Sequence, residues 1–410
     1  MITPVPVPEG HDFLDPDILA ERVPLEEYAW LRKTAPVFWN PQTVEDSSFD
    51  DGGLWIISKL EDIKAISSAK EGWSSEENTA IPKFDGKTVG YQEREIQKNM
   101  MLNMDGEHHQ KVRGVVARGV FTPRGVAKLG DLLERRANDI VLAAKERGSG
   151  DFVDDIACEL PLQAIADLVG FDQEDRRKIF NWSNQMMAYD DPEYDVDPAS
   201  AAAEILGYAV ALGEDRKANP RDDIITRLVA AADDETLDSE EFAFFVLMLA
   251  VAGNETTRNA ISHGMQAFFD NPDQWELYKE KRPETTADEI VRWGTPVQMF
   301  QRTAMADAEV GGQLIKAGQR VGLLYGSANY DEEVFENPYS FNIMRDPNYH
   351  VGFGGGGTHF CPGTHLAKLE INLIFNALAD HCPNIAPDGP QRRLRSAWLN
   401  GIKGMPVKYV

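Results

Sequence analysis

A cysteine follows a glycine run and directly precedes a Pro-Gly pair in residues 352–363, which read GFGGGGTHFCPG. Three kinds of chemistry suit such a stretch. The glycines could cradle a phosphate, Cys361 and nearby histidines could bind zinc, or a Cys361 thiolate could ligate a haem iron. A fourth interpretation involves no chemistry, because a free cysteine is most often a small buried hydrophobe.

The phosphate and zinc interpretations fit the surrounding residues poorly. A phosphate loop should follow a strand, and residues 346–351 (DPNYHV) form no clear strand; no GK[ST] follows the run. His359 and Cys361 are closer in sequence than zinc ligand pairs usually are, and His381 and Cys382 lie one helix away.

The haem interpretation explains more of the stretch. Proline is favoured at the first position of a helix, so Pro362 predicts that Cys361 caps the helix that follows. The N–H groups of Gly363 and Thr364 could then point at the sulfur, and a helix N-terminus lowers the pKa of a thiol. Considered alone, however, Cys361 is still best interpreted as a buried hydrophobe. Evidence for a haem ligand must therefore come from residues elsewhere in the chain.

The most apolar helical segment of the chain is interrupted by several polar residues. Residues 252–257 read AGNETT, and a glycine, an acid and two hydroxyls each cost stability inside a buried helix. A functional reason is a groove that admits O2 and delivers protons through Glu255 and Thr256. The alternative is a kinked helix whose hydroxyls are satisfied locally.

Two further patterns involve charged residues. Glu289 and Arg292 are spaced to share one helix face, although surface ion pairs of this kind are common. His109 and Arg113 share a face in the same way. Residues 108–130 contain five Lys or Arg and no acid, in a chain of net charge −26. That basic segment is either functional or a solvated helix face.

The elements that must position these residues are mainly helical. Apolar residues recur at helical spacing in 130–147 and 239–271, and 366–379 is also helical. Residues 54–58 predict a strand, and 308–328 predict a hairpin that turns at Gly311-Gly312. Residues 328–349 should be irregular, and the acidic segment 190–197 a loop, with an interdomain linker as the alternative. We therefore expect one mainly α domain with a small β part, spanning 1–410.

Composition excludes some classes of partner and compartment. The 410 residues are 42% hydrophobic, ample for a large core. A charge of −26 disfavours binding to nucleic acid or anionic membranes. The apolar run 242–253 is too short for a transmembrane anchor. No signal peptide is recognisable, and three cysteines do not make a disulfide framework, so we expect a cytoplasmic protein.

Together, the cysteine loop, the AGxET helix, the ExxR helix and the His-Arg pair resemble the cytochrome P450 superfamily, from about residue 14 to the end of the chain. The resemblance is closer still to the bacterial steroid C26-monooxygenases. The segments that carry this closer likeness are EENTAIPKF (76–84), LNMD (102–105), LAVAGNETTRNAI (249–261), TPVQMFQRTA (295–304), DEEVFENP (331–338) and WLNGIKG (398–404).

The resemblance implies the triangular-prism P450 fold, with haem b between the oxygen-binding helix and the helix after the cysteine loop. It implies Cys361 as the axial iron ligand and Thr256 and Glu255 as the residues of oxygen activation and proton delivery. Glu289 and Arg292 would form the structural ExxR pair. The remaining cofactor-binding residues would be His109, Arg113, Arg302 and His359 at the propionates, with His108 as an alternative to His109, and Ala252, Gly253, Phe353 and Gly363 elsewhere around the haem.

The implied activity is insertion of one atom of O2 into the terminal methyl carbon of a sterol side chain, such as that of cholesterol or cholest-4-en-3-one. Electrons would come from a ferredoxin, which its NAD(P)H reductase would reduce. The ferredoxin would dock on a basic patch that includes Lys111, Arg118, Arg124 and Lys368. We expect a monomer. The apolar substrate funnel would be lined by Ile81, Met100, Met101, Val251, Val297, Phe300 and Trp398. The alternatives are terminal hydroxylation of another branched lipid or terpenoid, and a haem-thiolate sensor without turnover.

Two positions depart from the family pattern. The loop usually places a phenylalanine seven residues before the cysteine, whereas Phe353 is eight before Cys361, a spacing shared with the steroid subgroup. A third member of the ExxR network is often an arginine further along the chain, and Ser340 stands at that place. The network is therefore expected to close through backbone groups or another side chain.

Overall fold

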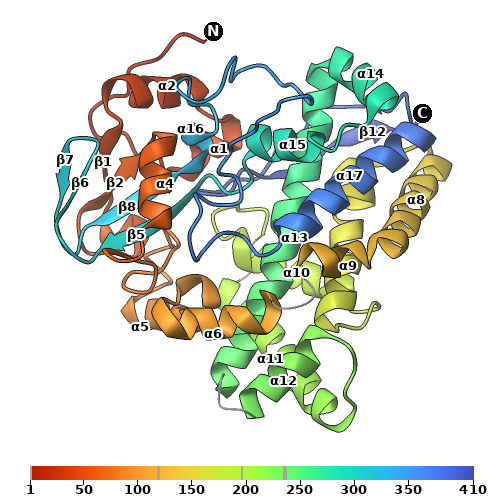
Figure 1. Cartoon of the computed structure of the whole chain (residues 1–410), viewed down its shortest axis with the longest axis horizontal. Helices are drawn as coiled ribbons and strands as arrows, with labels where there is room; N and C mark the ends of the chain where they lie inside the picture. The colour runs from red at the N-terminus through yellow and green to blue at the C-terminus, as the bar shows by residue number, and fades with distance from the viewer. Residues whose placement is uncertain (1, 118–120, 195–196, 234–237) are drawn as a thin grey trace.

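A single long helix, α13 (Ser239–Asp270), runs through the middle of the molecule (Figure 1). The computed structural model describes residues 2–117, 121–194, 197–233 and 238–410. The helix begins where Asp238 accepts hydrogen bonds from the backbone of Glu240 and Glu241, and Glu241 accepts one from the backbone of Asp238 in return. This capping box fixes the start of the helix. The helix predicted over 239–271 is confirmed.

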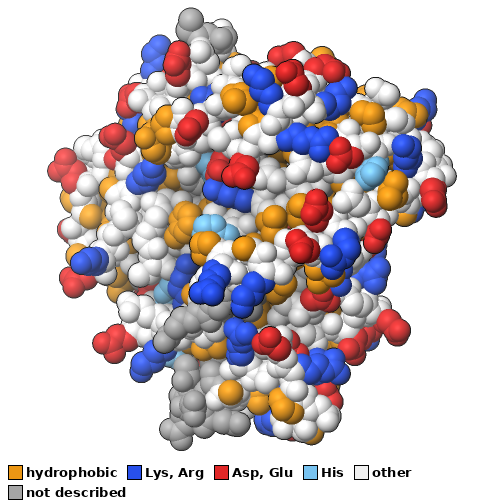
Figure 2. Space-filling model, turned by 45° about the vertical axis from the view of Figure 1, so that its right-hand side comes forward, with side chains coloured by type: hydrophobic (Ala, Val, Ile, Leu, Met, Phe, Trp, Pro, Cys, Tyr) orange, Lys and Arg blue, Asp and Glu red, His pale blue; other side chains and the backbone are white. Residues whose placement is uncertain are grey.

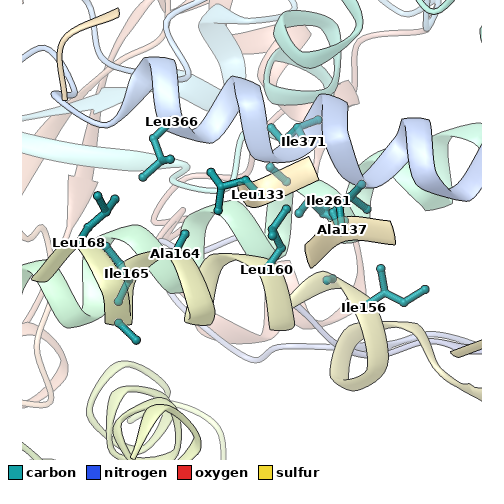
Figure 3. Packing of buried hydrophobic residues seen from close by; sticks show 14 of the residues in the cluster. Leu133, Ala137, Ile156, Leu160, Ala164, Ile165, Leu168, Ile261, Leu366 and Ile371 are labelled. Carbon is teal, nitrogen blue, oxygen red and sulfur yellow. The ribbon is translucent and has the colours of Figure 1, made fainter. Parts of the chain in front are cut away.

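Three helices form the main core with α13: α8 (Gly130–Arg147), α9 (Glu159–Val169) and α17 (Thr364–His381). Leu160 and Leu168 of α9, Leu366 and Ile371 of α17 and Ile261 of α13 belong to one buried apolar cluster (Figure 3). This cluster holds α17, which follows the cysteine loop, in a fixed place relative to α13. The helices predicted over 130–147 and 366–379 are confirmed.

The remaining helices surround this core. They are α1 (Pro16–Glu21), α2 (Leu25–Thr34), α3 (Val44–Ser47), α4 (Leu60–Ser68), α5 (Tyr91–Ile96), α6 (Gly106–Ala117), α7 (Pro123–Ala127), α10 (Arg176–Met187), α11 (Pro198–Ala218), α12 (Ile224–Asp233), α14 (Pro272–Lys281), α15 (Thr286–Gly294) and α16 (Tyr325–Ala328). In the described residues, 329–363 contain turns and no helix or strand, so the expected irregular region is confirmed.

The main sheet has the strand order β1-β2-β8-β5-β3 and lies to one side of the helices (Figure 1). Its strands are β1 (Val37–Pro41), β2 (Gly53–Ile57), β8 (Arg320–Leu324), β5 (Met299–Ala304) and β3 (Trp73–Ser74). β2 pairs with β8 in parallel, and the other pairs are antiparallel. The strand predicted at 54–58 is β2. β5 carries Phe300, which is partly buried, and Arg302, which is buried.

The predicted hairpin over 308–328 is confirmed for its first half only. β6 (Ala308–Val310) and β7 (Gln313–Ile315) pair across Gly311 and Gly312, whose φ angles are 54° and 80°. The apolar segment that follows, β8, leaves the hairpin and enters the main sheet, because its side chains are buried throughout. Smaller sheets pair β4 (Ser149–Asp151), β12 (Pro406–Lys408) and β9 (Ala386–Pro387), and β10 (Arg392–Arg393) with β11 (Ile402–Gly404).

Within the described ranges, none of the helices combines the length and the apolar character needed to cross a bilayer. The part of segment 190–197 that the structure describes contains turns and leads into α11, as expected of a loop.

Candidate functional site

The cysteine loop is a run of turns that packs against the end of α4. Gly354, Gly356 and Gly357 have φ angles of 100°, 102° and 72°, in the region that favours glycine. A Cβ on Gly357 would lie 2.1 Å from the carbonyl oxygen of Ser67. The glycines are therefore needed for chain direction and for close approach to α4, a reason that the sequence alone does not reveal.

Cys361 is partly buried at the end of this loop, and its backbone N–H donates to the carbonyl of Phe353 at 3.0 Å. The prediction that Cys361 caps α17 is wrong, because the helix begins at Thr364 and Gly363 is its N-cap. The N–H groups of Gly363 and Thr364 nevertheless point at the sulfur. Burial raises the pKa of the Cys361 thiol, and these N–H groups and Arg113 offset only part of that rise. The N–H groups at the start of the helix thus lower the pKa of the thiol, as expected, but burial outweighs their effect.

Four basic side chains from distant segments meet beside the cysteine loop. His109 and Arg113 come from α6, Arg302 from β5, and His359 from the loop itself. The rings of His109 and His359 stack with their centroids 4.3 Å apart. Arg113 donates to the carbonyl of Phe360. The structure thus brings together all four residues named for the propionates.

This cluster carries buried positive charge that an anion would neutralise. Burial, and then the positive charges of His359 and Arg113, lower the pKa of His109 to about 4. Burial also lowers the pKa of Arg302, whose side chain donates to the carbonyl of Gln301 at 2.6 Å. Among the described residues, no carboxylate lies within ion-pairing distance of Arg302 or Arg113, and an unpaired buried charge is costly. His359 does have a carboxylate nearby, because its Nε2 lies 3.5 Å from Oδ1 of Asp105.

These residues fit a haem. A cysteine sulfur lies beside a cluster of basic groups whose two arginines lack a carboxylate partner among the described residues, which is the donor set that an iron porphyrin with two propionates requires. His108, the alternative to His109, points elsewhere and pairs with Glu241 of α13. Described His, Cys, Asp and Glu side chains gather nowhere in threes that could hold a metal ion, so the zinc interpretation gains no support.

On α13, the AGNETT segment continues the α-helix without a break. Ala252 is exposed and Thr256 partly exposed, although most of the helix is buried. The Thr256 hydroxyl donates to the carbonyl of Ala252 at 2.9 Å. A Cβ on Gly253 would lie 2.8 Å from Ile165, so this glycine permits α9 to approach α13 closely.

Glu255 is buried and paired within its own helix. Its Oε1 accepts hydrogen bonds from Arg258 and from Asn259, the latter at 3.1 Å, while its Oε2 has no partner among the described residues. Arg258 in turn donates to Asn184 of α10 at 3.0 Å. Arg258 and Asn184 were not among the residues predicted from the sequence. The spacing of Glu255 and Arg258, three residues apart on a helix, could have indicated the ion pair.

Glu289 and Arg292 of α15 form a fully buried ion pair with two hydrogen bonds of 2.8 Å. Arg345 completes the network, because it donates to Glu289 at 3.0 Å. Arg292 also donates to the carbonyls of Asn329 and Pro338, both at 2.9 Å. The network closes through a side chain and through backbone groups, both of which were expected, and the side chain is Arg345.

The candidate substrate-lining residues divide into two groups. Ile81 and Trp398 belong to one apolar cluster, against which Val297 and Phe300 pack. The rings of Phe300 and Trp398 are 5.8 Å apart. Met100 and Met101 belong with the larger helical core, and Val251 is buried on α13.

The basic segment is only partly described, since Arg118 lies outside the described residues. Lys111 and Arg124 are exposed, as expected. Lys368 is not free, because it pairs with Asp288 at 2.6 Å, and its ammonium lies 5.7 Å from the centre of the Phe353 ring. Figure 2 shows a group of Lys and Arg side chains just below the centre of one face, among scattered acidic residues.

Comparison with known proteins agrees with this geometry. The cytochrome P450 family model matches residues 284–389. A steroid C26-monooxygenase of Rhodococcus jostii is 59% identical over 404 residues, 98% of this chain and 85% of the relative. A methyl-branched lipid omega-hydroxylase of Mycobacterium tuberculosis is 38% identical over 395 residues, 93% of this chain and 90% of the relative. A cytochrome P450 of Mycobacterium marinum solved with pseudoionone is 36% identical, covers 93% of this chain and 94% of its own, and superposes with a TM-score of 0.87.

Proposed function

The chain belongs to the cytochrome P450 family, and from this premise we propose that it hydroxylates the terminal methyl carbon of a sterol side chain, such as that of cholesterol or cholest-4-en-3-one. The fold and the monooxygenase activity are those of the family, with haem b as cofactor and O2 as co-substrate. The observation that carries the choice of substrate is the 59% identity to a steroid C26-monooxygenase over nearly the whole chain.

The reaction consumes one O2, two electrons and two protons. One oxygen atom enters the C–H bond as a hydroxyl group, and the other leaves as water. When bound, the haem supplies the oxygen-activating chemistry, and the protein supplies the ligand, the protons and the substrate pose. In our proposal, Cys361 is the iron ligand. The partial hydrogen bonding of its sulfur by Gly363 and Thr364 keeps it in position.

Around the cofactor, His109, Arg113, Arg302 and His359 neutralise the propionates, and Phe353, Gly363, Ala252 and Gly253 lie against the ring. Arg302 and Arg113, which are short of carboxylate partners, are the strongest support for this assignment. Glu289 and Arg292 act at a distance, since their ion pair with Arg345 holds α15 to the turns before the cysteine loop.

Protons reach the co-substrate through α13. In this proposal the Thr256 hydroxyl would turn from the carbonyl of Ala252 and pass its proton to the co-substrate. The Glu255 carboxyl group would then give its own proton to the Thr256 oxygen and take up another from water. Two observations support these roles: Thr256 is partly exposed on a mostly buried helix, and Glu255 Oε2 has no partner among the described residues. Arg258 holds the other oxygen of Glu255 and so fixes the direction in which Oε2 points.

The sterol lies in an apolar funnel lined by Ile81, Val297, Phe300 and Trp398, with Met100, Met101 and Val251 nearer to α13. Electrons come singly from a ferredoxin with its NAD(P)H reductase. An acidic ferredoxin would be repelled by a chain of charge −26 except at the exposed Lys111 and Arg124, where steering raises the association rate. The protein acts as a single P450 domain over 1–410, a monomer in the cytoplasm.

The test is a reduced, carbon-monoxide-treated visible spectrum, then titration and turnover with sterols. We expect thiolate-type absorption, a spectral shift on sterol binding, and a terminal alcohol as product. The relative that acts on methyl-branched lipids favours a second candidate, a branched fatty acid. Turnover of that lipid but not of sterols would establish the second candidate, and a spectrum without turnover of either would indicate a sensor.

A further inference from the structure

Beside the apolar cluster around Trp398 lies a half-buried chain of hydrogen bonds. The indole N–H of Trp398 donates to the hydroxyl of Tyr189 at 2.9 Å. The same hydroxyl donates to the carbonyl of Lys83 at 2.8 Å. Burial of this hydroxyl, and then the charge of Asp190, raise the pKa of Tyr189 well above its usual range, so the group stays protonated and able to donate. The hydroxyl is therefore both an acceptor and a donor.

This chain joins three segments that are far apart in the sequence. Tyr189 lies in the connection between α10 and α11, Lys83 lies just after Ile81, and Trp398 lies near the end of the chain. Ile81, Ala188 and Trp398 belong to the same apolar cluster. One phenolic oxygen thus connects three walls of the proposed substrate funnel.

Each wall is anchored independently of Tyr189. The carbonyl of Trp398 accepts a hydrogen bond from the backbone N–H of Gln298 at 2.8 Å. The carboxylate of Asp190 accepts from the backbone N–H of Ala397 at 3.0 Å, and Asp191 pairs with Lys403 at 2.7 Å. The backbones will consequently stay in place without the Tyr189 hydroxyl. The hydroxyl therefore fixes only the orientation of the Trp398 indole. The indole also lies against the ring of Phe300, with the ring centroids 5.8 Å apart.

We propose that Tyr189 is a specificity-determining positioning residue, which fixes the Trp398 indole so that the funnel presents only the terminal methyl carbon of the side chain for oxidation. The inference rests on the proposed function and names the residue that sets its regioselectivity. The chemistry makes such a device necessary. A side chain that ends in an isopropyl group has a tertiary C–H bond next to its methyl groups, and that bond is weaker than the primary ones. Oxidation of a methyl group therefore requires a pose held to a fraction of an ångström.

The test is the holoprotein variant Tyr189→Phe, which removes one oxygen atom and keeps the ring. With cholest-4-en-3-one, a ferredoxin and its reductase, the ratio of terminal to tertiary alcohol is measured by mass spectrometry. A buried hydrogen bond of ordinary strength corresponds to a shift of about fivefold toward the tertiary alcohol. The carbon-monoxide spectrum should not change.

The matched control is Tyr278→Phe. Tyr278 is a buried tyrosine of α14 whose hydroxyl donates to Asn376 at 3.0 Å, outside the Trp398 cluster. Tyr189→Phe loses both hydrogen bonds of its hydroxyl, with Trp398 and Lys83, and Tyr278→Phe loses those with Asn376 and Asn372. Both variants should lose some thermal stability, but only Tyr189→Phe should change the product ratio. An unchanged ratio in Tyr189→Phe, or an equal change in both variants, overturns the inference. If the parent protein forms no side-chain alcohol, the proposed function fails, and the inference fails with it.

Discussion

Replacement of Arg302 by methionine should have opposite effects on the haem-free protein and on haem binding. The Arg302 guanidinium is 6% exposed and has the carbonyl of Gln301 as its hydrogen-bond acceptor, without a carboxylate partner among the described residues. Burial of an ion costs several kcal/mol unless it is paired. Methionine has a similar length and carries no charge. Arg302→Met should therefore stabilise the haem-free protein by about 1–3 kcal/mol.

The same variant should bind haem more weakly. A hydrogen bond between a guanidinium and a propionate contributes about 1.5–3 kcal/mol. Its loss corresponds to an affinity that is about 10–150-fold lower, since each 1.4 kcal/mol is about a factor of ten. Arg302→Lys keeps the charge without the planar geometry of arginine and should fall between the parent and Arg302→Met.

Two assays measure these quantities. Urea unfolding of the haem-free protein gives its free energy of unfolding, and haem transfer to an excess of apomyoglobin gives the haem dissociation rate. The combination of higher haem-free stability and faster haem loss distinguishes an unpaired haem-facing charge from a structural one. A lower haem-free stability together with unchanged haem loss would refute this explanation of Arg302.

Four further predictions concern single residues of the site. Cys361→Ala should abolish the thiolate-type spectrum of the reduced carbon-monoxide complex, and Cys382→Ala should retain it; a thiolate spectrum in Cys361→Ala would refute the ligand assignment. Thr256→Ala should keep haem and sterol binding but release more hydrogen peroxide per NADH consumed, and unchanged coupling would remove this hydroxyl from the mechanism. Glu289→Gln should cost about 3–5 kcal/mol in urea unfolding, because it leaves two buried guanidiniums without a carboxylate, and a loss below 1 kcal/mol would contradict the network. The pKa of His109 is lowered to about 4, so the haem-free protein should lose up to about 3 kcal/mol of stability as the pH falls from about 6.5 to 4; His109→Gln should flatten this dependence in urea titrations, and an equal slope in both proteins would speak against it.

Local patterns predicted the elements well because they depend on residues close in sequence. The helix expected over 130–147 matches α8, and α13 ends one residue before the predicted 271. The ExxR pair was also visible, since its members are three residues apart. By contrast, Arg345 meets Glu289 from 56 positions away, and this contact depends on how the turns before the cysteine loop fold. No periodicity could indicate it.

The errors at Cys361 have the same origin. The sequence suggests a helix that begins at Pro362 and a thiol stabilised as an anion by the helix N-terminus. In the structure the helix begins later, at Thr364, and burial raises the pKa of the thiol more than the N–H groups of Gly363 and Thr364 lower it. Burial and pairing are properties of the whole fold, so the residue types predicted the site, whereas the charge states of its residues could not be predicted.

The central claim is tested most directly by finding which carbon of the product carries the new oxygen atom. The holoprotein is incubated with cholest-4-en-3-one, a ferredoxin, its reductase, NADH and 18O-labelled O2, and the products are analysed by mass spectrometry. We predict a side-chain alcohol with one labelled oxygen atom at a terminal methyl carbon. A protein with a thiolate-type carbon-monoxide spectrum that leaves the sterol unlabelled, or that labels only its ring system, would contradict the proposed function.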